Sequence, residues 1–128
     1  MKRLVMDLDG TITSGESSDY ENVGVNHEVV ARLRDYKAQG FEIVIHTARN
    51  MRTHNSSLGK ITALTVPVII RWLEKHDIPY DEIWVGKPWC GSDGFYVDDK
   101  AVRPDEFARL SYDEIRALLD MGAQPDHI

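Results

Sequence analysis

A short apolar run that ends in two aspartates is the feature that most constrains how this chain can fold. Residues 4–6 (Leu-Val-Met) lack the polar alternation of a half-exposed strand and therefore predict a buried one. Asp7 and Asp9 follow, and Gly10 then allows a sharp turn. Side chains at positions i and i+2 of an extended segment point the same way, so both carboxylates are expected to face one small volume. Two anions so close repel each other unless a cation or a proton joins them. An acidic turn exposed to water at a strand end accounts for the same two residues equally well.

Size and composition limit the class of protein. At 128 residues the chain predicts a single domain, residues 1–128, with one sizeable core. The formal net charge of -6 and the lack of a basic run argue against non-specific binding to nucleic acid. No apolar stretch approaches the roughly 18–20 residues of a membrane span, and the run before Asp7 is too short for a signal peptide. The single cysteine, Cys90, excludes an internal disulfide framework, so a cytoplasmic location is expected.

The first half of the chain alternates between predicted strands and helices. Residues 12–25 are polar and rich in Gly, Ser, Asp and Asn, which predicts a loop or an irregular hairpin. A helix is expected over 27–39 with Asn26 as its cap, followed by a second buried strand over 41–45. A strand, a crossover helix and a strand in this order predict a right-handed parallel unit with both strand ends at one edge.

The second half continues the alternation less regularly. Residues 60–76 have helical periodicity, and Pro67 within them predicts either a kink or two helical pieces. Short strands are expected over 82–85 and 95–97, and a turn or short helix over 103–107.

A final helix is expected over 112–121, with a capping box formed by Ser111 and Glu114 and an end at Gly122. The whole pattern predicts the α/β class. We expect a single Rossmann-like domain with a mainly parallel sheet between two layers of helices, a three-layer α/β/α arrangement.

Polar side chains that suit phosphate chemistry follow each of the four predicted strands. In chain order they are Asp7 with Asp9, Thr47, Lys87, and Asp98 with Asp99. Because the carboxyl ends of parallel strands meet at one edge, these side chains are expected to lie together. Carboxylates from two strand ends can hold a hard cation such as Mg2+. A threonine and a lysine beside them supply a donor and a positive charge for phosphate oxygens.

These segments resemble the four motifs of the haloacid dehalogenase-like phosphohydrolase superfamily. The matching segments are Asp7-Leu8-Asp9-Gly10-Thr11, the apolar strand that ends in Thr47, Gly86-Lys87-Pro88, and Tyr96-Val97-Asp98-Asp99. The similarity covers nearly the whole chain and keeps the motif order. More narrowly, residues 46–52 and 85–91 are similar to a small group of members without a cap domain. That group is associated with the biosynthesis of bacterial capsules and surface polysaccharides.

The resemblance implies a role for each carboxylate. Asp7 would attack phosphorus and form an aspartyl-phosphate. Asp9 would protonate the leaving oxygen and then activate a water. The Asp7 carboxylate, Asp9 through its backbone carbonyl, and Asp98 would bind Mg2+, with Asp99 acting through a water. Dehalogenating relatives lack an acid at the place of Asp9, so a phosphatase is favoured.

The resemblance also implies roles for the residues after the middle strands. Thr47 would hydrogen-bond the transferring phosphoryl group, and Lys87 would offset its negative charge. Lys60 is the alternative lysine. Further substrate contacts are expected from the residues that follow the second strand, namely Ala48, Arg49, Arg52 and His54. Trp89 either stacks on the substrate or anchors its own loop.

No stretch of the chain is long enough for an inserted cap, since 12–25 and 51–59 are both too short for a folded domain. An open site suits a large substrate or one covered by a neighbouring subunit. The similar capless octulosonate-phosphate phosphatases are tetramers, so we expect a homo-oligomer, either a dimer or a tetramer.

The leading hypothesis is a Mg2+-dependent phosphatase acting on a phosphorylated sugar or a polysaccharide precursor. One alternative is a domain of the same fold that binds a partner without turnover. Another is a phospho-receiver signalling domain, which is disfavoured because its phosphoacceptor aspartate lies on a later strand than its acidic pair.

Overall fold

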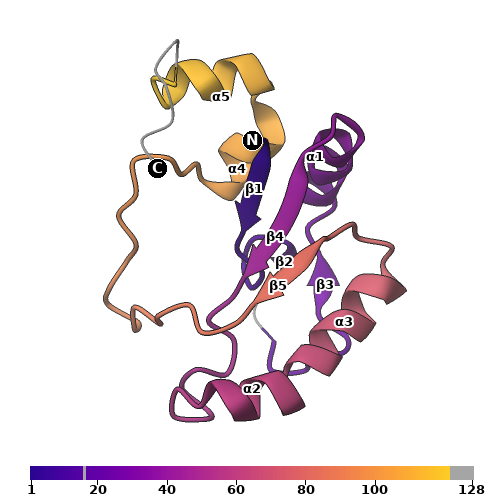
Figure 1. Cartoon of the computed structure of the whole chain (residues 1–128), viewed down its shortest axis with the longest axis vertical. Helices are drawn as coiled ribbons and strands as arrows, with labels where there is room; N and C mark the ends of the chain where they lie inside the picture. The colour runs from indigo at the N-terminus through magenta and orange to yellow at the C-terminus, as the bar shows by residue number, and fades with distance from the viewer. Residues whose placement is uncertain (16, 122–128) are drawn as a thin grey trace.

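The centre of the fold is a three-stranded parallel sheet in the order β1-β4-β5 (Figure 1). The computed structural model describes residues 1–15 and 17–121. Within it, β1 spans Arg3–Met6, β4 spans Glu42–His46 and β5 spans Glu82–Trp84. Both neighbouring pairs are parallel. The mainly parallel α/β sheet predicted from the sequence is therefore confirmed, and all three strands end at the same edge.

The segment between β1 and the first helix is a small antiparallel hairpin, as predicted for residues 12–25. Its strands are β2 (Thr13–Ser14) and β3 (Gly24–Val25). The helix that follows, α1 (His27–Ala38), begins at Asn26, whose side chain accepts a hydrogen bond from the Val29 backbone N–H. Its apolar stripe is buried, as predicted; the buried residues are Val29, Val30, Leu33 and Tyr36.

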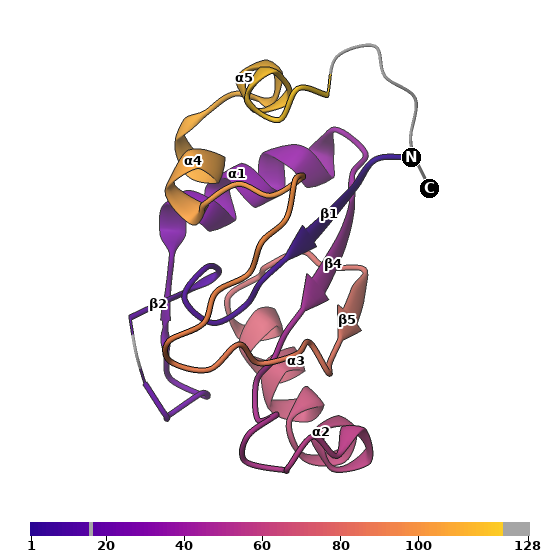
Figure 2. The same cartoon turned by 90° about the vertical axis from the view of Figure 1, so that its left-hand side faces the viewer.

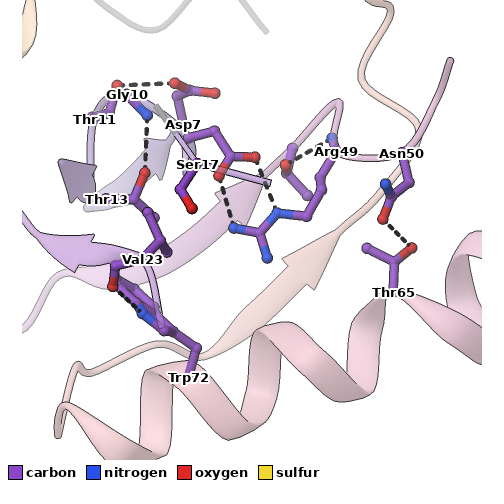
Figure 3. A network of polar contacts seen from close by, with 12 residues as sticks. Asp7, Gly10, Thr11, Thr13, Ser17, Val23, Arg49, Asn50, Thr65 and Trp72 are labelled. Carbon is purple, nitrogen blue, oxygen red and sulfur yellow. Dashed lines mark hydrogen bonds and ion pairs between the residues drawn. The ribbon is translucent and has the colours of Figure 1, made fainter. Parts of the chain in front are cut away.

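Two helical pieces connect β4 to β5. They are α2 (Leu58–Leu64) and α3 (Val66–Lys75), and Pro67 lies in the first turn of α3. The second of the two predicted alternatives is thus confirmed, because proline is tolerated in a first turn but not inside a helix. The buried indole of Trp72 donates a hydrogen bond to the Val23 carbonyl at 2.9 Å, which ties α3 to the β2–β3 hairpin (Figure 3).

Two short helices end the described chain. Residues predicted as a turn or short helix form α4 (Pro104–Arg109), and α5 spans Tyr112–Leu118 behind the predicted capping box. Both pack on α1 through aromatic side chains. Phe107 stacks on Tyr36 with ring centroids 5.3 Å apart. The helix ends before residue 121, and the predicted stop at Gly122 lies outside the described residues.

The helices cover one face of the sheet only (Figures 1 and 2). Met6, Ile43 and Ile45 point into the core shared with α1 and α3. On the opposite face Val5 is 61% exposed and Trp84 is 55% exposed. The predicted three-layer arrangement is therefore wrong for the part of the chain that the structure describes, which forms two layers. Val5 also departs from the prediction that residues 4–6 are all buried.

The predicted fourth strand over 95–97 is wrong as well. After β5 the chain runs as an extended arc on the β1 side of the sheet before it reaches α4 (Figure 1). Phe95 is 79% exposed and Val97 is 88% exposed. The apolar run has the composition of a strand, but a strand also needs a neighbouring strand, and this segment pairs with none in the described part of the chain.

No helix in the described ranges is long and apolar enough to cross a membrane.

Candidate functional site

The turn after β1 is fixed by its own backbone and projects the two aspartates from the sheet edge. The buried Leu8 carbonyl accepts hydrogen bonds from three backbone N–H groups, those of Thr11, Ile12 and Thr13. Gly10 has φ 81, which favours glycine, and its N–H donates to the Thr13 hydroxyl at 3.1 Å. Backbone polar groups that are satisfied locally make this turn a rigid base for the side chains on it.

The Asp7 carboxylate is held on two sides and open on a third. One oxygen accepts a hydrogen bond from the Thr11 hydroxyl at 2.9 Å, and the other lies 3.4 Å from the Lys87 ammonium (Figure 3 shows the Thr11 contact). The Asp7 side chain remains 38% exposed. Lys87 is itself positioned because its backbone N–H donates to the Thr47 carbonyl at 3.2 Å. Of the two lysine candidates, Lys87 is thus the one beside Asp7, while Lys60 is exposed on α2.

Asp9 is held differently, by a two-pronged ion pair. Arg49 Nη2 lies 2.7 Å from one Asp9 oxygen, and Arg49 Nε donates to the other at 3.0 Å. The Arg49 side chain is only 1% exposed, and the Tyr20 ring lies 4.0 Å from its guanidinium carbon. Paired N–H donors of this kind hold a carboxylate in one orientation and also balance its negative charge. Arg49, predicted to contact substrate, therefore binds Asp9.

One guanidinium nitrogen of Arg49 has no hydrogen-bond partner among the described residues. Its Nη1 atom is buried and makes no hydrogen bond within residues 1–15 and 17–121. The backbone of Arg49 is fixed, because its N–H donates to the buried Thr47 hydroxyl oxygen at 3.0 Å. Thr47 still has its own O–H to donate, as its predicted contact with a phosphoryl group requires.

These side chains open into a cavity of about 540 Å³. Six of the residues predicted for the site line it, namely Asp7, Asp9, Thr47, Ala48, Arg49 and Arg52. The loop that carries Arg52 is anchored, because the Thr65 hydroxyl donates to the Asn50 side chain at 2.7 Å (Figure 3). His54, the remaining candidate on that loop, is not part of the lining.

Three aromatic residues also line the cavity, namely Tyr20, Trp89 and Tyr96. The Tyr96 hydroxyl donates to the Pro88 carbonyl at 2.6 Å, and its ring lies 4.3 Å from the Lys87 ammonium. Burial raises the pKa of the Tyr96 hydroxyl. Tyr20 lies between the two strands of the β2–β3 hairpin. Tyr96 escaped prediction as a lining residue because it was assigned to a strand.

His46 is the last residue of β4. Burial, and then the nearby Lys87 charge, lower its pKa, while Asp7 acts in the opposite direction. Its ring packs edge-on against Trp84 at 6.4 Å. Burial thus favours the neutral form of this histidine.

Asp98 and Asp99 lie on the exposed arc and do not line the cavity. Asp98 instead accepts a hydrogen bond from the Lys100 backbone N–H at 2.8 Å. In the described ranges no three His, Cys, Asp or Glu residues come close enough to hold a metal ion. Mg2+ prefers oxygen ligands, and Asp7 and the Asp9 carbonyl are of that kind. Asp98, the third predicted ligand, does not line the cavity, so the described part of one chain does not bring the predicted donor set together.

No protein-family model and no curated protein matches the chain. A crystal structure from Vibrio cholerae, described only as a structural target, is 57% identical, with a TM-score of 0.92. The match covers 94% of this chain and 98% of that one. A chain from the structure of a Pnkp1/Rnl/Hen1 complex is 21% identical with a TM-score of 0.51. That match covers 85% of this chain and 34% of the other, so the present chain spans about a third of it and shares the fold alone.

Proposed function

We propose that this chain, which belongs to the same family as the Vibrio cholerae protein, is a phosphatase that works through a phosphorylated Asp7. The observation that carries the proposal is the setting of that carboxylate. It is partly exposed at the carboxyl end of a parallel strand, 3.4 Å from the Lys87 ammonium, and it opens into the same cavity as Thr47. Phosphoryl transfer requires little more than such positioning and charge stabilisation. The order of these motifs supports a Rossmann-like domain of the haloacid dehalogenase-like superfamily without a cap.

The reaction has two halves. An Asp7 oxygen attacks phosphorus, the bond from phosphorus to the leaving oxygen breaks, and that oxygen takes a proton from Asp9. Asp9 then removes a proton from a water, whose oxygen attacks the aspartyl-phosphate and releases inorganic phosphate. Lys87 offsets the negative charge during both halves, and the Thr47 hydroxyl donates to a phosphoryl oxygen.

Asp9 can serve this reaction only if its contact with Arg49 changes. Both Asp9 oxygens accept hydrogen bonds from Arg49, at 2.7 and 3.0 Å. One oxygen must therefore leave the guanidinium before it can exchange a proton with the leaving group or a water. Arg49 is accordingly a residue that positions Asp9, while Ala48 and Arg52 remain as candidates for binding the substrate itself.

Mg2+ is part of the proposal as the expected cofactor. Its chemistry would be to neutralise charge on the phosphate and on Asp7. The Asp7 carboxylate and the Asp9 backbone carbonyl are its candidate ligands in this chain. The third predicted ligand, Asp98, is outside the cavity. The steps above therefore give only the roles of this chain's own side chains, to which the ion would add its charge.

A phosphorylated sugar or a polysaccharide precursor is the proposed substrate class. The cavity of about 540 Å³ is large for a phosphate alone. Tyr20, Trp89 and Tyr96 offer flat apolar faces with polar tips beside it, which suit a ring that carries hydroxyl groups. A cytoplasmic location, inferred from the single cysteine, belongs to the same proposal.

The test is the release of inorganic phosphate from a panel of sugar phosphates and one aryl phosphate, with Mg2+ or with EDTA. We expect turnover with Mg2+, its loss in EDTA, and its loss in Asp7→Asn while the circular dichroism spectrum is unchanged. Peptide mass spectrometry after rapid acid quench should place one phosphoryl group on the peptide that contains Asp7. No turnover of any substrate and no modified peptide would favour a domain that binds without catalysis.

A further inference from the structure

We propose that a second copy of this chain adds its residues 95–98 to the free edge of β1 and so brings its Asp98 beside Asp7 of the first copy. The docking of the strand follows from the backbone alone. Only the purpose given to Asp98, as a ligand for the expected cation, rests on the proposed function.

The edge of β1 is open in the described part of the chain. β1 pairs with β4 on one side, and no further strand joins the sheet on the other. An unpaired edge presents a row of free N–H and C=O groups that readily accepts another strand. Val5, in the middle of β1, is 61% exposed. The edge therefore offers both unpaired backbone and apolar surface.

Residues 95–97 have the complementary properties. Among the residues that the structure describes, the stretch 88–102 makes no hydrogen bond between backbone groups. Phe95 and Val97 are 79% and 88% exposed within it. An apolar, extended segment with unpaired backbone is a strand that lacks its neighbour.

The same chain is badly placed to supply this strand in the parallel direction. Lys87 is fixed at the carboxyl edge of the sheet by the Thr47 carbonyl and by Asp7. Residues 88–94 would then have to carry the chain back to the beginning of β1, whereas parallel crossovers take about a dozen residues or more. The bond from the Tyr96 hydroxyl to the Pro88 carbonyl also closes residues 88–96 into a local loop. A second copy is free of this constraint on length.

The register that places Asp98 level with Asp7 also matches the side chains. It sets Val97 beside Met6 and Phe95 beside Leu4, on the face of the sheet that the helices cover. Tyr96 then lies beside Val5 on the other face. A shift by one residue would turn all of these side chains to the wrong faces. Asp98 and Asp7, both anionic, would be held together by the cation that the single chain does not fully coordinate.

A reciprocal exchange between two copies uses the same contact twice, as expected for a two-fold dimer. It covers Phe95 and Val97, the most exposed apolar side chains of the arc, and places Tyr96 beside the exposed Val5 of β1. It also completes both sites, so that neither copy is fully active alone.

Cysteine pairing tests the docking without any assay of activity. In a Cys90→Ser background, a Val5→Cys chain is mixed with a Tyr96→Cys chain under mild oxidation. We expect a disulfide-linked heterodimer, identified by mass spectrometry of the joined peptides. The matched control mixes Tyr96→Cys with Leu64→Cys, an exposed position on α2, and should give none. The double variant Val5→Cys/Tyr96→Cys should also link between chains. A link within one chain, or no link at all in either case, overturns the proposal.

Complementation tests the shared site. Asp7→Asn and Asp98→Asn chains are each expected to be inactive and, in a heterodimer, to form one intact site from Asp7 of one chain and Asp98 of the other. Random mixing in equal amounts should restore about a quarter of the wild-type activity, because about half the dimers are mixed and each has one working site of two. No recovery, with heterodimers shown by native mass spectrometry, overturns the shared site. If the cysteine variants cross-link but the wild-type protein has no phosphatase activity, the docking is retained and the proposed function is rejected.

Discussion

At the scale of single residues, the two aspartates at the end of β1 differ in what holds them. Asp7 accepts from a hydroxyl and lies beside an ammonium, yet stays 38% exposed. Asp9 gives both oxygens to a guanidinium that is itself buried. A nucleophile needs an oxygen that the substrate can reach. A group that transfers protons needs a fixed position, and here also a contact with Arg49 that can break to free one oxygen. The environments thus separate two side chains that the sequence presents as equivalent.

Replacing Lys87 tests which lysine serves the phosphate. Lys87→Ala should lower kcat/KM for an aryl phosphate on the order of 10²-fold or more, because a preorganised charge beside the reacting oxygens is removed. Lys60→Ala is the matched control and should retain wild-type kinetics, since its side chain is exposed on α2. Steady-state kinetics of both variants provide the measurement. A larger loss in Lys60→Ala than in Lys87→Ala would exchange their roles.

Replacing Arg49 tests whether it positions Asp9 or binds substrate. In Arg49→Lys the paired N–H donors are lost while the charge remains, so Asp9 should be held less firmly. We expect a lower kcat with little change in KM for a small aryl phosphate, and a shifted pH profile of kcat. Arg52→Ala should do the opposite, raising KM for a larger substrate and leaving kcat nearly constant. A higher KM with unchanged kcat in Arg49→Lys would show that Arg49 binds the substrate directly.

At the scale of secondary-structure elements, one carboxylate joins a helix to two strands. Asp81, just before β5, accepts from the Lys37 ammonium on α1 at 2.8 Å and from the Ile43 backbone N–H on β4 at 2.8 Å. Chiefly the Lys37 hydrogen bond, and next that of Ile43, lower the pKa of Asp81 below its ordinary 3.8. The Asp81 side chain is 34% exposed, so solvent screening limits the contribution of its charge to the free energy of unfolding to about 1 kcal/mol.

That contribution has a defined pH dependence. Because the folded pKa lies below the unfolded one, the stabilisation is fully present above about pH 4 and is lost as the pH falls through the folded pKa. Asp81→Asn should therefore lower the free energy of unfolding at pH 7 by about 1 kcal/mol and by less in acid. Urea unfolding at several pH values between about 2 and 7 measures the difference. A penalty that is the same at every pH would mean that the charge of Asp81 contributes nothing.

The elements that could be predicted from the sequence are those set by local pattern. The stripe of α1 from Val29 to Tyr36, and the break at Pro67, specify their helices without reference to distant residues. Residues 95–97 could not be placed because a strand exists only beside another strand, and no local signal shows whether that edge is reachable. The three-layer prediction was wrong for the same reason. It required residues 95–97 to pair with β1 on the side away from β4, so that the chain would continue on the other face of the sheet.

The same limit applies to the site. Asp7, Thr47 and Lys87 could be brought together from the sequence because the carboxyl ends of parallel strands share an edge. The ion pair between Arg49 and Asp9 could not be predicted, because the two residues are 40 positions apart and either side chain could equally have contacted solvent or substrate. The contact between the Tyr20 ring and Arg49 could not be predicted either, because Tyr20 lies in a loop whose path is not set by any sequence periodicity.

At the scale of the whole molecule, apolar side chains remain exposed on the sheet and on the arc that follows β5. The exposed side chains are Val5, Trp84, Phe95 and Val97. Val5 and Trp84 belong to the sheet, and Phe95 and Val97 to the arc. Exposed apolar surface of this kind often marks contacts with other chains. A strand added to β1 by another copy would supply the fourth strand that the sequence predicted for one chain, contributed in trans.

Dilution tests this view in the native protein. If Asp98 of one copy completes the site of the other, the specific activity must fall when the enzyme is diluted below the dissociation constant of the dimer. The decline in activity should then have the same midpoint as the decline in mass measured by light scattering or mass photometry. Val97→Asp, which places a charge in the docked strand, should shift both midpoints to higher protein concentration by the same factor. Lys100→Asp is the matched control on the exposed arc just beyond the docked residues 95–98, and it should shift neither midpoint appreciably. Constant specific activity across a range in which the dimer demonstrably dissociates would show that each chain builds its site alone, and Asp98 would then have to reach Asp7 within one chain.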